Sequence, residues 1–288
     1  MTLLLGVDTL TYHCRLDAGE ITVEEVFREA AELGFAFVQI NVVHVRHRSD
    51  TELAELRGLA DELGLAVHVA GEQVGYAHRG ETPADGVRRI LEWAEYCTAV
   101  GSPYLRVSSG FYRQELTDPA LVAAEQRYVT DTLRLAAAEL AGTGLKLLLE
   151  NHSDFTVGEY TRIIEEVGPD SVGVFLDLIN PISTLADPLP VVTELVRWAP
   201  AGHVKDYRFE SHYVAGGFHR RGFEVRWCYP GEGVADLAAL VGAVATGHRS
   251  PDYHLSVEGL DNRRGVADQR DRLKSALDTL RAVTGSAA

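Results

Sequence analysis

Short apolar runs alternate along the chain with longer segments in which apolar residues recur three and four positions apart. The first pattern predicts buried strands, and the second predicts amphipathic helices. The runs predict eight strands, at residues 3–10, 35–42, 65–70, 104–109, 146–152, 172–178, 202–207 and 253–259. The intervening segments predict helices at residues 23–33, 51–63, 83–100, 119–140, 157–166, 190–198, 234–244 and 266–282.

Several of these helices have residues that suit their ends. Thr22 can cap the first helix together with Glu25, three positions further on. Gly34, Gly64 and Gly101 follow helices at the position where a left-handed backbone conformation is common. Helices that end at glycine and lead into a strand within a few residues are typical of repeated βα units.

Eight such units in 288 residues favour an α/β fold made of a single closed (β/α)8 TIM barrel. An open, doubly wound sheet usually has fewer strands. No linker rich in Pro, Gly or Ser interrupts the alternation, so residues 1–288 are predicted to form one domain. The irregular stretch at about 208–233 is expected to be an extended lid loop over the mouth of the barrel, and residues 285–288 a short flexible tail.

Composition removes several classes of partner. The net charge of -15 disfavours nucleic acid and anionic membrane surfaces. No GxGxxG or Walker motif follows the first strand, so no nucleotide cofactor is expected. The N-terminal residues resemble neither a signal peptide nor a membrane anchor, and the three cysteines are too widely spaced for a disulfide framework. A cytoplasmic location is therefore expected.

Acidic and imidazole side chains stand at the ends of four consecutive predicted strands. They are Glu150, Asp177, His203 and Glu258. Active sites of (β/α)8 barrels lie at the carboxyl ends of the strands, and an unpaired charge buried there is costly. Each group could be satisfied separately by a cation or a backbone amide, but the convergence of four favours a metal site. This oxygen-rich set suits Mn2+ first, then Mg2+ or Co2+, with Zn2+ also open.

Five segments carry a resemblance to a known family. They are LLLENH at 147–152, VGVFLDLIN at 172–180, GHVKD at 202–206, PGEGVAD at 230–236 and SVEG at 256–259. With them the whole chain resembles the xylose isomerase-like TIM barrel superfamily, the sugar phosphate isomerase/epimerase family. This group also includes ketose 3-epimerases, hydroxypyruvate isomerase, and inosose and dehydroshikimate dehydratases.

The resemblance implies that Glu150, Asp177, His203 and Glu258 hold one divalent cation. It also implies that the GEG turn at 231–233 closes toward the eighth strand. Relatives of this fold commonly form dimers or tetramers, so a homo-oligomer is expected by resemblance. The sequence itself shows no exposed apolar stripe from which oligomerisation could be derived.

A cation chelated by a substrate carbonyl and its neighbouring hydroxyl acidifies the nearby carbon-bound hydrogen. A carboxylate can then remove this proton and leave a metal-stabilised enediolate. In the epimerases that the chain resembles, the glutamates of strands five and eight act as both ligand and acid/base, on opposite faces of the substrate. The resemblance thus makes Glu150 and Glu258 the expected proton-transfer pair, and a purely structural role for both is the alternative.

Lys205 and Asn180 refine this expectation. Lys205 follows His203 by two positions, so both should point into the barrel, where Lys205 could polarise a carbonyl or hold a carboxylate or phosphate. A salt bridge to the metal-binding acids is the alternative. Asn180 stands where several relatives carry a histidine, which counts against a ketohexose 3-epimerase and against the trinuclear zinc cluster of the endonuclease IV branch.

Substrate-binding residues are predicted near the mouth of the barrel, namely His68, His152, Asn180, Arg208 and Trp227. For His68 a packed core position is the alternative. Trp227 is expected to stack on a sugar face. Arg208 belongs to a cationic cluster expected either to bind an anionic substrate or to remain solvated, completed by His212, His219, Arg221 and Arg226.

The expected function is that of a divalent-metal-dependent isomerase or epimerase acting on a small carbohydrate or keto-sugar acid. The alternative is a lyase, a dehydratase, decarboxylase or deglycosidase, that uses the same chemistry to expel a group. A non-catalytic binding subunit is a third hypothesis, and it predicts a broken ligand set, whereas all four candidate ligands are present.

Overall fold

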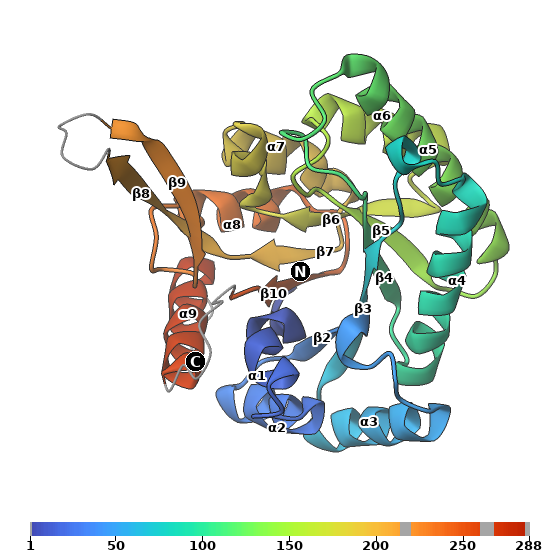
Figure 1. Ribbon diagram of the computed structural model, residues 1–288. Helices are drawn as coiled ribbons and strands as arrows, with labels where there is room; N and C mark the ends of the chain where they lie inside the picture. Colours follow the sequence, from blue (N-terminus) through green and yellow to red (C-terminus); the bar gives the residue numbers. More distant parts are fainter. Residues whose placement is uncertain (1, 214–219, 260–267, 286–288) are drawn as a thin grey trace.

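The computed structural model describes residues 2–213, 220–259 and 268–285 (Figure 1). Eight parallel strands close into a barrel in the order β1-β10-β7-β6-β5-β4-β3-β2. These strands are β1 Thr2–Asp8, β2 Phe37–Asn41, β3 Ala66–Gln73, β4 Tyr104–Ser108, β5 Lys146–Glu150, β6 Val172–Asp177, β7 Ala201–Val204 and β10 Asp252–Val257. The ring closes because β1 pairs with both β2 and β10. The predicted (β/α)8 barrel is confirmed.

Helices surround this barrel (Figure 1). Those of the described residues are α1 His13–Asp17, α2 Val23–Leu33, α3 Asp50–Leu63, α4 Pro83–Val100, α5 Pro119–Glu139, α6 Val157–Val167, α7 Pro188–Leu195, α8 Leu237–Gly247 and α9 Gln269–Thr284. Only the short α1 has no counterpart in the sequence prediction, because five residues are too few to show helical periodicity. Within the described ranges, no helix combines the length and the apolar character needed to cross a membrane.

Local contacts explain why the helices begin and end where they do. At the start of α2, the backbone N–H of Glu25 donates to Thr22 Oγ1 at 3.2 Å, and the N–H of Thr22 donates to Glu25 Oε2 at 2.8 Å. At its end, Gly34 adopts a φ of 84°, which a residue without a Cβ tolerates best. Helix α2 is therefore capped at both ends, as its sequence predicts.

The interior of the barrel changes character along the strands. Midway along β5 and β6 it contains a small apolar cluster formed by Leu148, Phe175 and Ala201. The main apolar core lies between the strands and the surrounding helices. Toward the strand ends the interior is polar, and this polar end carries the candidate site.

The segment expected to be an irregular lid loop is instead largely a β-hairpin. Strands β8 (Asp206–Tyr213) and β9 (Arg220–Cys228) pair in antiparallel fashion and project from the barrel (Figure 1). The hairpin was missed because charged residues separate its apolar ones, so no continuous apolar run marks either strand. Its role as a lid remains a prediction. His219 and the tail residues 286–288 lie outside the described residues.

Replacing Gly202 by Ala is expected to destabilise the barrel. A Cβ at this position in β7 would overlap the backbone carbonyl oxygen of Leu176 and lie 2.7 Å from Tyr253 Oη. Overpacking of this kind costs about 1–3 kcal/mol. Urea unfolding would measure the loss against Gly58→Ala in α3, where a Cβ meets nothing within 4 Å and stability should rise by up to about 1 kcal/mol. A Gly202 variant as stable as wild type would contradict the described packing of β7 on β6.

Candidate active site

Four side chains converge at the carboxyl ends of the barrel strands. Glu150 ends β5, Asp177 ends β6, His203 lies in β7 and Glu258 follows β10. His203 Nδ1 lies 3.5 Å from Glu150 Oε1, 3.9 Å from Asp177 Oδ2 and 3.7 Å from Glu258 Oε1. Glu150, Asp177 and His203 form a buried group able to hold a metal ion, and Glu258 faces the same imidazole nitrogen.

The orientation of the His203 ring fits a metal ligand. Its Nε2 lies 3.0 Å from Asp8 Oδ2, an oxygen that also accepts a 2.6 Å hydrogen bond from the side chain of Gln39. The other nitrogen, Nδ1, is buried and has no hydrogen-bond partner among the described residues. A histidine that binds a metal usually donates its second N–H to a carboxylate, and the 3.0 Å distance from Nε2 to Asp8 Oδ2 suits this arrangement.

The balance of buried charge also fits a divalent cation. Two buried cations contact these acids. Lys205 Nζ donates to Asp177 Oδ2 at 2.7 Å and to Glu258 Oε2 at 2.6 Å, and the Arg106 guanidinium pairs with Glu150. The site contains four buried carboxylates, those of Glu150, Asp177, Glu258 and Asp8, and two permanently charged cations, Lys205 and Arg106. If His203 is neutral, the net charge of these side chains is therefore -2. One divalent cation would balance this charge, because uncompensated buried charge is costly.

The pKa values of the site reflect this crowding of charge. Burial alone would raise the pKa of the Glu150 and Glu258 carboxyl groups, but Arg106 beside Glu150 and Lys205 beside Glu258 hold both pKa values below their ordinary range. Burial alone would lower the pKa of His203, but the charge of Glu258 and the hydrogen bond to Asp8 raise it to about 10. Without a bound cation the surrounding acids therefore favour a protonated His203, and a metal ion bound at Nδ1 would replace that proton.

Two asparagines hold the candidate metal-binding acids in place. Asn151 donates to the backbone oxygen of Asp177 at 2.8 Å and accepts from its N–H at 2.7 Å, which ties β5 to β6. Asn180 donates its side-chain N–H to Glu150 Oε1 at 3.3 Å, and its backbone N–H donates to Asp177 Oδ1 at 2.7 Å. Asn180 therefore contacts two candidate ligands, and its predicted contact with substrate stays a prediction.

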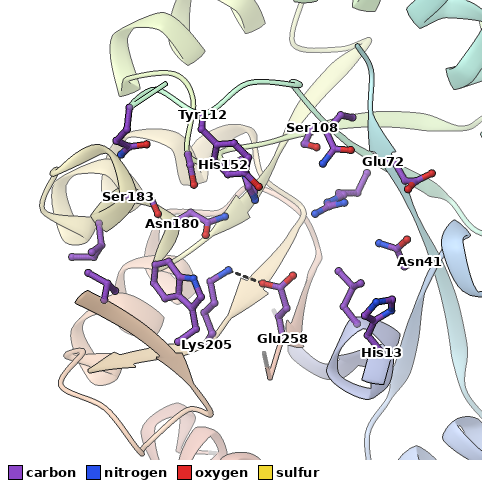
Figure 2. Close-up of a pocket in the computed structure, with 18 of the residues that line it drawn as sticks. His13, Asn41, Glu72, Ser108, Tyr112, His152, Asn180, Ser183, Lys205 and Glu258 are labelled. Atoms are coloured by element: carbon purple, nitrogen blue, oxygen red, sulfur yellow. Dashed lines mark hydrogen bonds and ion pairs between the residues drawn. The ribbon is translucent and has the colours of Figure 1, made fainter. Parts of the chain in front are cut away.

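A cavity of about 880 Å³ opens above these groups. Figure 2 shows the Lys205–Glu258 ion pair between His13 and Asn41 on one side and Tyr112 and His152 on the other. Trp227, predicted to contact substrate, also lines the cavity, as do Arg106 and Asn180.

Two predicted substrate-binding residues lie elsewhere. His68 is the third residue of β3, which runs on to Gln73, so its side chain stacks on His254 near the strand starts rather than facing the cavity. Arg208 is exposed and pairs across the hairpin with Arg226. Trp227 pairs with Tyr207 and therefore shares its face of the hairpin. Arg208 follows Tyr207 in the same strand, and neighbouring residues of a strand point to opposite faces, so Arg208 and Trp227 lie on opposite faces. The substrate contacts expected of His68 and Arg208 are thus corrected.

The stacked pair of buried His68 and half-buried His254 predicts a loss of stability at low pH. The two rings stack with centroids 4.5 Å apart, and burial lowers the pKa of both histidines, although Asp252 partly offsets this for His254. Below the unfolded-state pKa of about 6.5, the unfolded chain therefore binds more protons than the folded one. The free energy of unfolding should fall as the pH drops from about 6.5, by up to about 1.4 kcal/mol per pH unit for each group.

His68→Phe should make this pH dependence less steep, and urea unfolding between pH 7 and 5 would show it. Replacing the exposed His212 by Gln is the matched control. Equal slopes in wild type and His68→Phe would contradict the prediction.

Three polar residues of the site were missed by the sequence analysis. Asp8 ends β1 and follows the apolar run Leu3–Val7, so the rule that found Glu150 applies to it equally. Gln39 and Arg106 are polar residues flanked on both sides by apolar ones in the middle of β2 and β4. A polar residue between apolar neighbours in a barrel strand is the signal that would have identified them as facing the interior.

The protein resembles several solved structures across nearly its whole length. The IolI protein with a bound zinc atom is 16% identical, with a TM-score of 0.71, over 98% of each chain. D-Psicose 3-epimerase from Clostridium cellulolyticum H10, solved with D-tagatose, is 13% identical, with a TM-score of 0.73, over 98% of this chain and 99% of that one. The probable 3-DHS dehydratase AsbF of Bacillus anthracis is 18% identical, with a TM-score of 0.67, over 97% and 98%.

At these low identities, the TM-scores show a shared fold and nothing further. A search of curated proteins found no match. The family profile described as xylose isomerase-like TIM barrel matches residues 27–283, which is most of the chain. The resemblance inferred from the strand-end motifs is therefore confirmed, and the chain belongs to the xylose isomerase-like TIM barrel family.

Proposed function

We propose that the protein is a divalent-metal-dependent isomerase or epimerase of a small carbohydrate or keto-sugar acid. One observation carries this proposal: a buried imidazole nitrogen, without a hydrogen-bond partner among the described residues, faces three carboxylates. One of them, Glu258, lines the large cavity. The zinc-bound IolI neighbour and the epimerase neighbour support it by analogy of fold.

Glu150, Asp177, His203 and Glu258 would hold the cation through Nδ1 of His203 and the carboxylate oxygens that face it. Mn2+ is the proposed ion, because three carboxylates and one imidazole form a hard donor set; Mg2+, Co2+ and Zn2+ suit the same residues less closely. A bound cation would polarise a substrate carbonyl and make the hydrogen on the adjacent carbon more acidic.

Glu150 and Glu258 are the proposed groups that remove and return this proton. Their low pKa values keep both ionised near neutral pH, which a proton acceptor requires. Lys205 holds one oxygen of Glu258 at 2.6 Å and leaves the other oxygen facing His203. We propose that Lys205 also contacts a substrate oxygen, because it lines the cavity. His152, Asn180 and Trp227, which line the same cavity, are proposed to contact the rest of the substrate.

A lyase is the second candidate, and two cations favour it. Arg106 and Lys205 are buried but line the cavity, where a guanidinium and an ammonium suit a substrate carboxylate. A keto-sugar acid that loses water or CO2 would react at the same carbon, the one beside the polarised carbonyl. The dehydratase neighbour is consistent with this candidate by fold.

Elemental analysis followed by proton NMR in D2O would test the proposal. The purified protein would be given a panel of ketoses, keto-sugar acids and their phosphates, with and without Mn2+. Metal-dependent deuterium uptake at one carbon of a rearranged sugar is the expected result, whereas loss of water, CO2 or an aglycone would identify the lyase. A protein that binds no metal and exchanges no hydrogen would contradict both and favour a non-catalytic binding subunit.

A further inference from the structure

One face of the β8–β9 hairpin is apolar. Directly paired residues of an antiparallel ribbon share a face, so Tyr207 with Trp227 and Phe209 with Val225 lie on the same side. Phe223, paired with Ser211, belongs to this side too, and its ring contacts that of Phe209 at a centroid distance of 4.9 Å. We call this side, defined by Tyr207, Phe209, Phe223, Val225 and Trp227, the apolar hairpin face.

The opposite face is charged, and its charges satisfy one another. Arg226 Nε lies 3.2 Å from Glu210 Oε2 and 3.1 Å from Glu224 Oε1. His212 Nε2 lies 3.0 Å from Glu224 Oε2. Two members of the cationic cluster expected to bind an anionic substrate, His212 and Arg226, are therefore paired with acids on the face that points away from Trp227. His219 and the side chain of Arg221 lie outside the described part of the chain.

The apolar hairpin face remains substantially exposed. Phe209 is 51% exposed and Phe223 is 62% exposed. A two-stranded ribbon cannot bury one of its own faces, and an apolar patch left beside a cavity indicates a binding surface.

This face continues the wall of the catalytic cavity. Phe223, Val225 and Trp227 line the cavity. Ile182, in the short 3-10 helix Asn180–Thr184 that follows β6, and Leu185, which caps this helix, line it too. Leu185 is 91% exposed and has a φ of 59°, the single positive value at a non-glycine among the described residues. A leucine held exposed in a left-handed conformation is strained, and such strain is concentrated at functional sites.

The cavity thus combines a polar floor with an apolar outer wall. The floor carries Arg106, Lys205 and Glu258. The volume of about 880 Å³ lies near the upper end of the range of about 300–1,000 Å³ typical of pockets for drug-sized ligands. A single sugar would fill the polar floor and leave the apolar outer part without a ligand.

We propose that the apolar hairpin face and Leu185 form an outer subsite for an aromatic aglycone carried by the substrate. This inference rests on the proposed function, because that function places the reacting sugar at the polar floor. Flat aromatic rings suit the indole of Trp227 and the ring of Phe223. The apolar hairpin face is continuous with the cavity, so one substrate could contact the polar floor with its sugar and this face with its aglycone. A second copy of the chain bound to the same face would block the mouth of the cavity.

Binding of matched glycosides by isothermal titration calorimetry would test the subsite. The Mn2+-loaded full chain would be titrated with 4-nitrophenyl and methyl 3-keto-β-D-glucosides and 3-keto-β-D-galactosides, whose ring ketone supplies the carbonyl that the proposed function requires. We expect the aryl member of at least one pair to bind about tenfold more tightly, through stacking and apolar burial.

Phe223→Ser and Leu185→Gly should each remove most of this preference and leave methyl glycoside binding unchanged. Leu185→Gly should also fold at least as well as wild type, because glycine accepts the positive φ. Glu210→Ser, on the charged face of the same hairpin, is the matched control and should change neither affinity.

Three results would overturn the proposal. The first is equal affinity within every aryl and methyl pair, or no aryl binding at all. The second is a preference unaffected by Phe223→Ser. The third concerns oligomeric state, measured by sedimentation velocity. If the wild type is a dimer and Phe223→Ser is a monomer with an unchanged preference for aryl ligands, the apolar hairpin face contacts a second copy of the chain.

The deuterium-exchange assay separates this proposal from the proposed function. An aryl preference lost in Phe223→Ser, without exchange in any substrate, would support the subsite and contradict the chemistry. Metal-dependent exchange without an aryl preference would support the chemistry and contradict the subsite.

Discussion

Glu258→Gln is expected to lower metal-dependent turnover by about 10²–10⁴-fold while the barrel remains folded. Glutamine keeps the shape of the side chain but cannot accept a proton, and it removes a negative charge that faces His203 Nδ1 at 3.7 Å. It also leaves Lys205 Nζ without the carboxylate oxygen that lies 2.6 Å away. Glu150→Gln should have an effect of similar size. Steady-state kinetics on the substrate identified by deuterium exchange would measure both.

Glu72→Gln is the matched control for this pair. Glu72 also lines the cavity, but it is exposed and pairs with Arg46 at 3.3 Å, so its replacement should change turnover by less than about twofold. Circular dichroism would establish that each variant is folded. A fully active Glu258→Gln enzyme would defeat the two-carboxylate proposal.

The candidate ligands could be located from the sequence because one physical rule covers all of them. In a parallel barrel every strand ends at the same rim, so an acid or imidazole that follows an apolar run must face its counterparts on neighbouring strands. Glu150, Asp177, His203 and Glu258 satisfy this rule, and the structure brings them around one imidazole nitrogen.

The surroundings of these ligands were harder to predict. Which cation neutralises which acid depends on three-dimensional distances, so the pairing of Arg106 with Glu150 and of Asp8 with His203 could not be derived from strand positions alone. The hydrogen bonds of Gln39 depend on the same distances.

Register explains the two misplaced substrate contacts. His68 was assigned to the end of a strand predicted over 65–70, whereas β3 continues to Gln73 and leaves His68 near the strand start. Arg208 was placed in an irregular loop, where no face is defined. Once the hairpin forms, the period of two fixes Arg208 on the face opposite Trp227. An error of a few residues in a boundary therefore changes which side chains reach a site.

Lys205→Met is expected to destabilise the metal-free protein by about 3–5 kcal/mol. Methionine has a similar length but no charge, so Asp177 and Glu258 would lose the ammonium that now lies 2.7 and 2.6 Å from them. Urea unfolding in the presence of a chelator would measure the loss. Lys274→Met is the control, because Lys274 is exposed, its pairing with Asp278 contributes little, and its loss should cost less than about 1 kcal/mol.

Saturating Mn2+ should stabilise Lys205→Met more than it stabilises the wild-type protein. In wild type, Lys205 and a divalent cation would compensate the same carboxylates, so part of the charge is already balanced before the metal binds. In the variant the site carries one more uncompensated negative charge, and the cation should bind more tightly and raise the unfolding free energy further. If Mn2+ stabilises the two proteins equally, Lys205 and the metal do not share these carboxylates. The balance of buried charge would then no longer support the metal site.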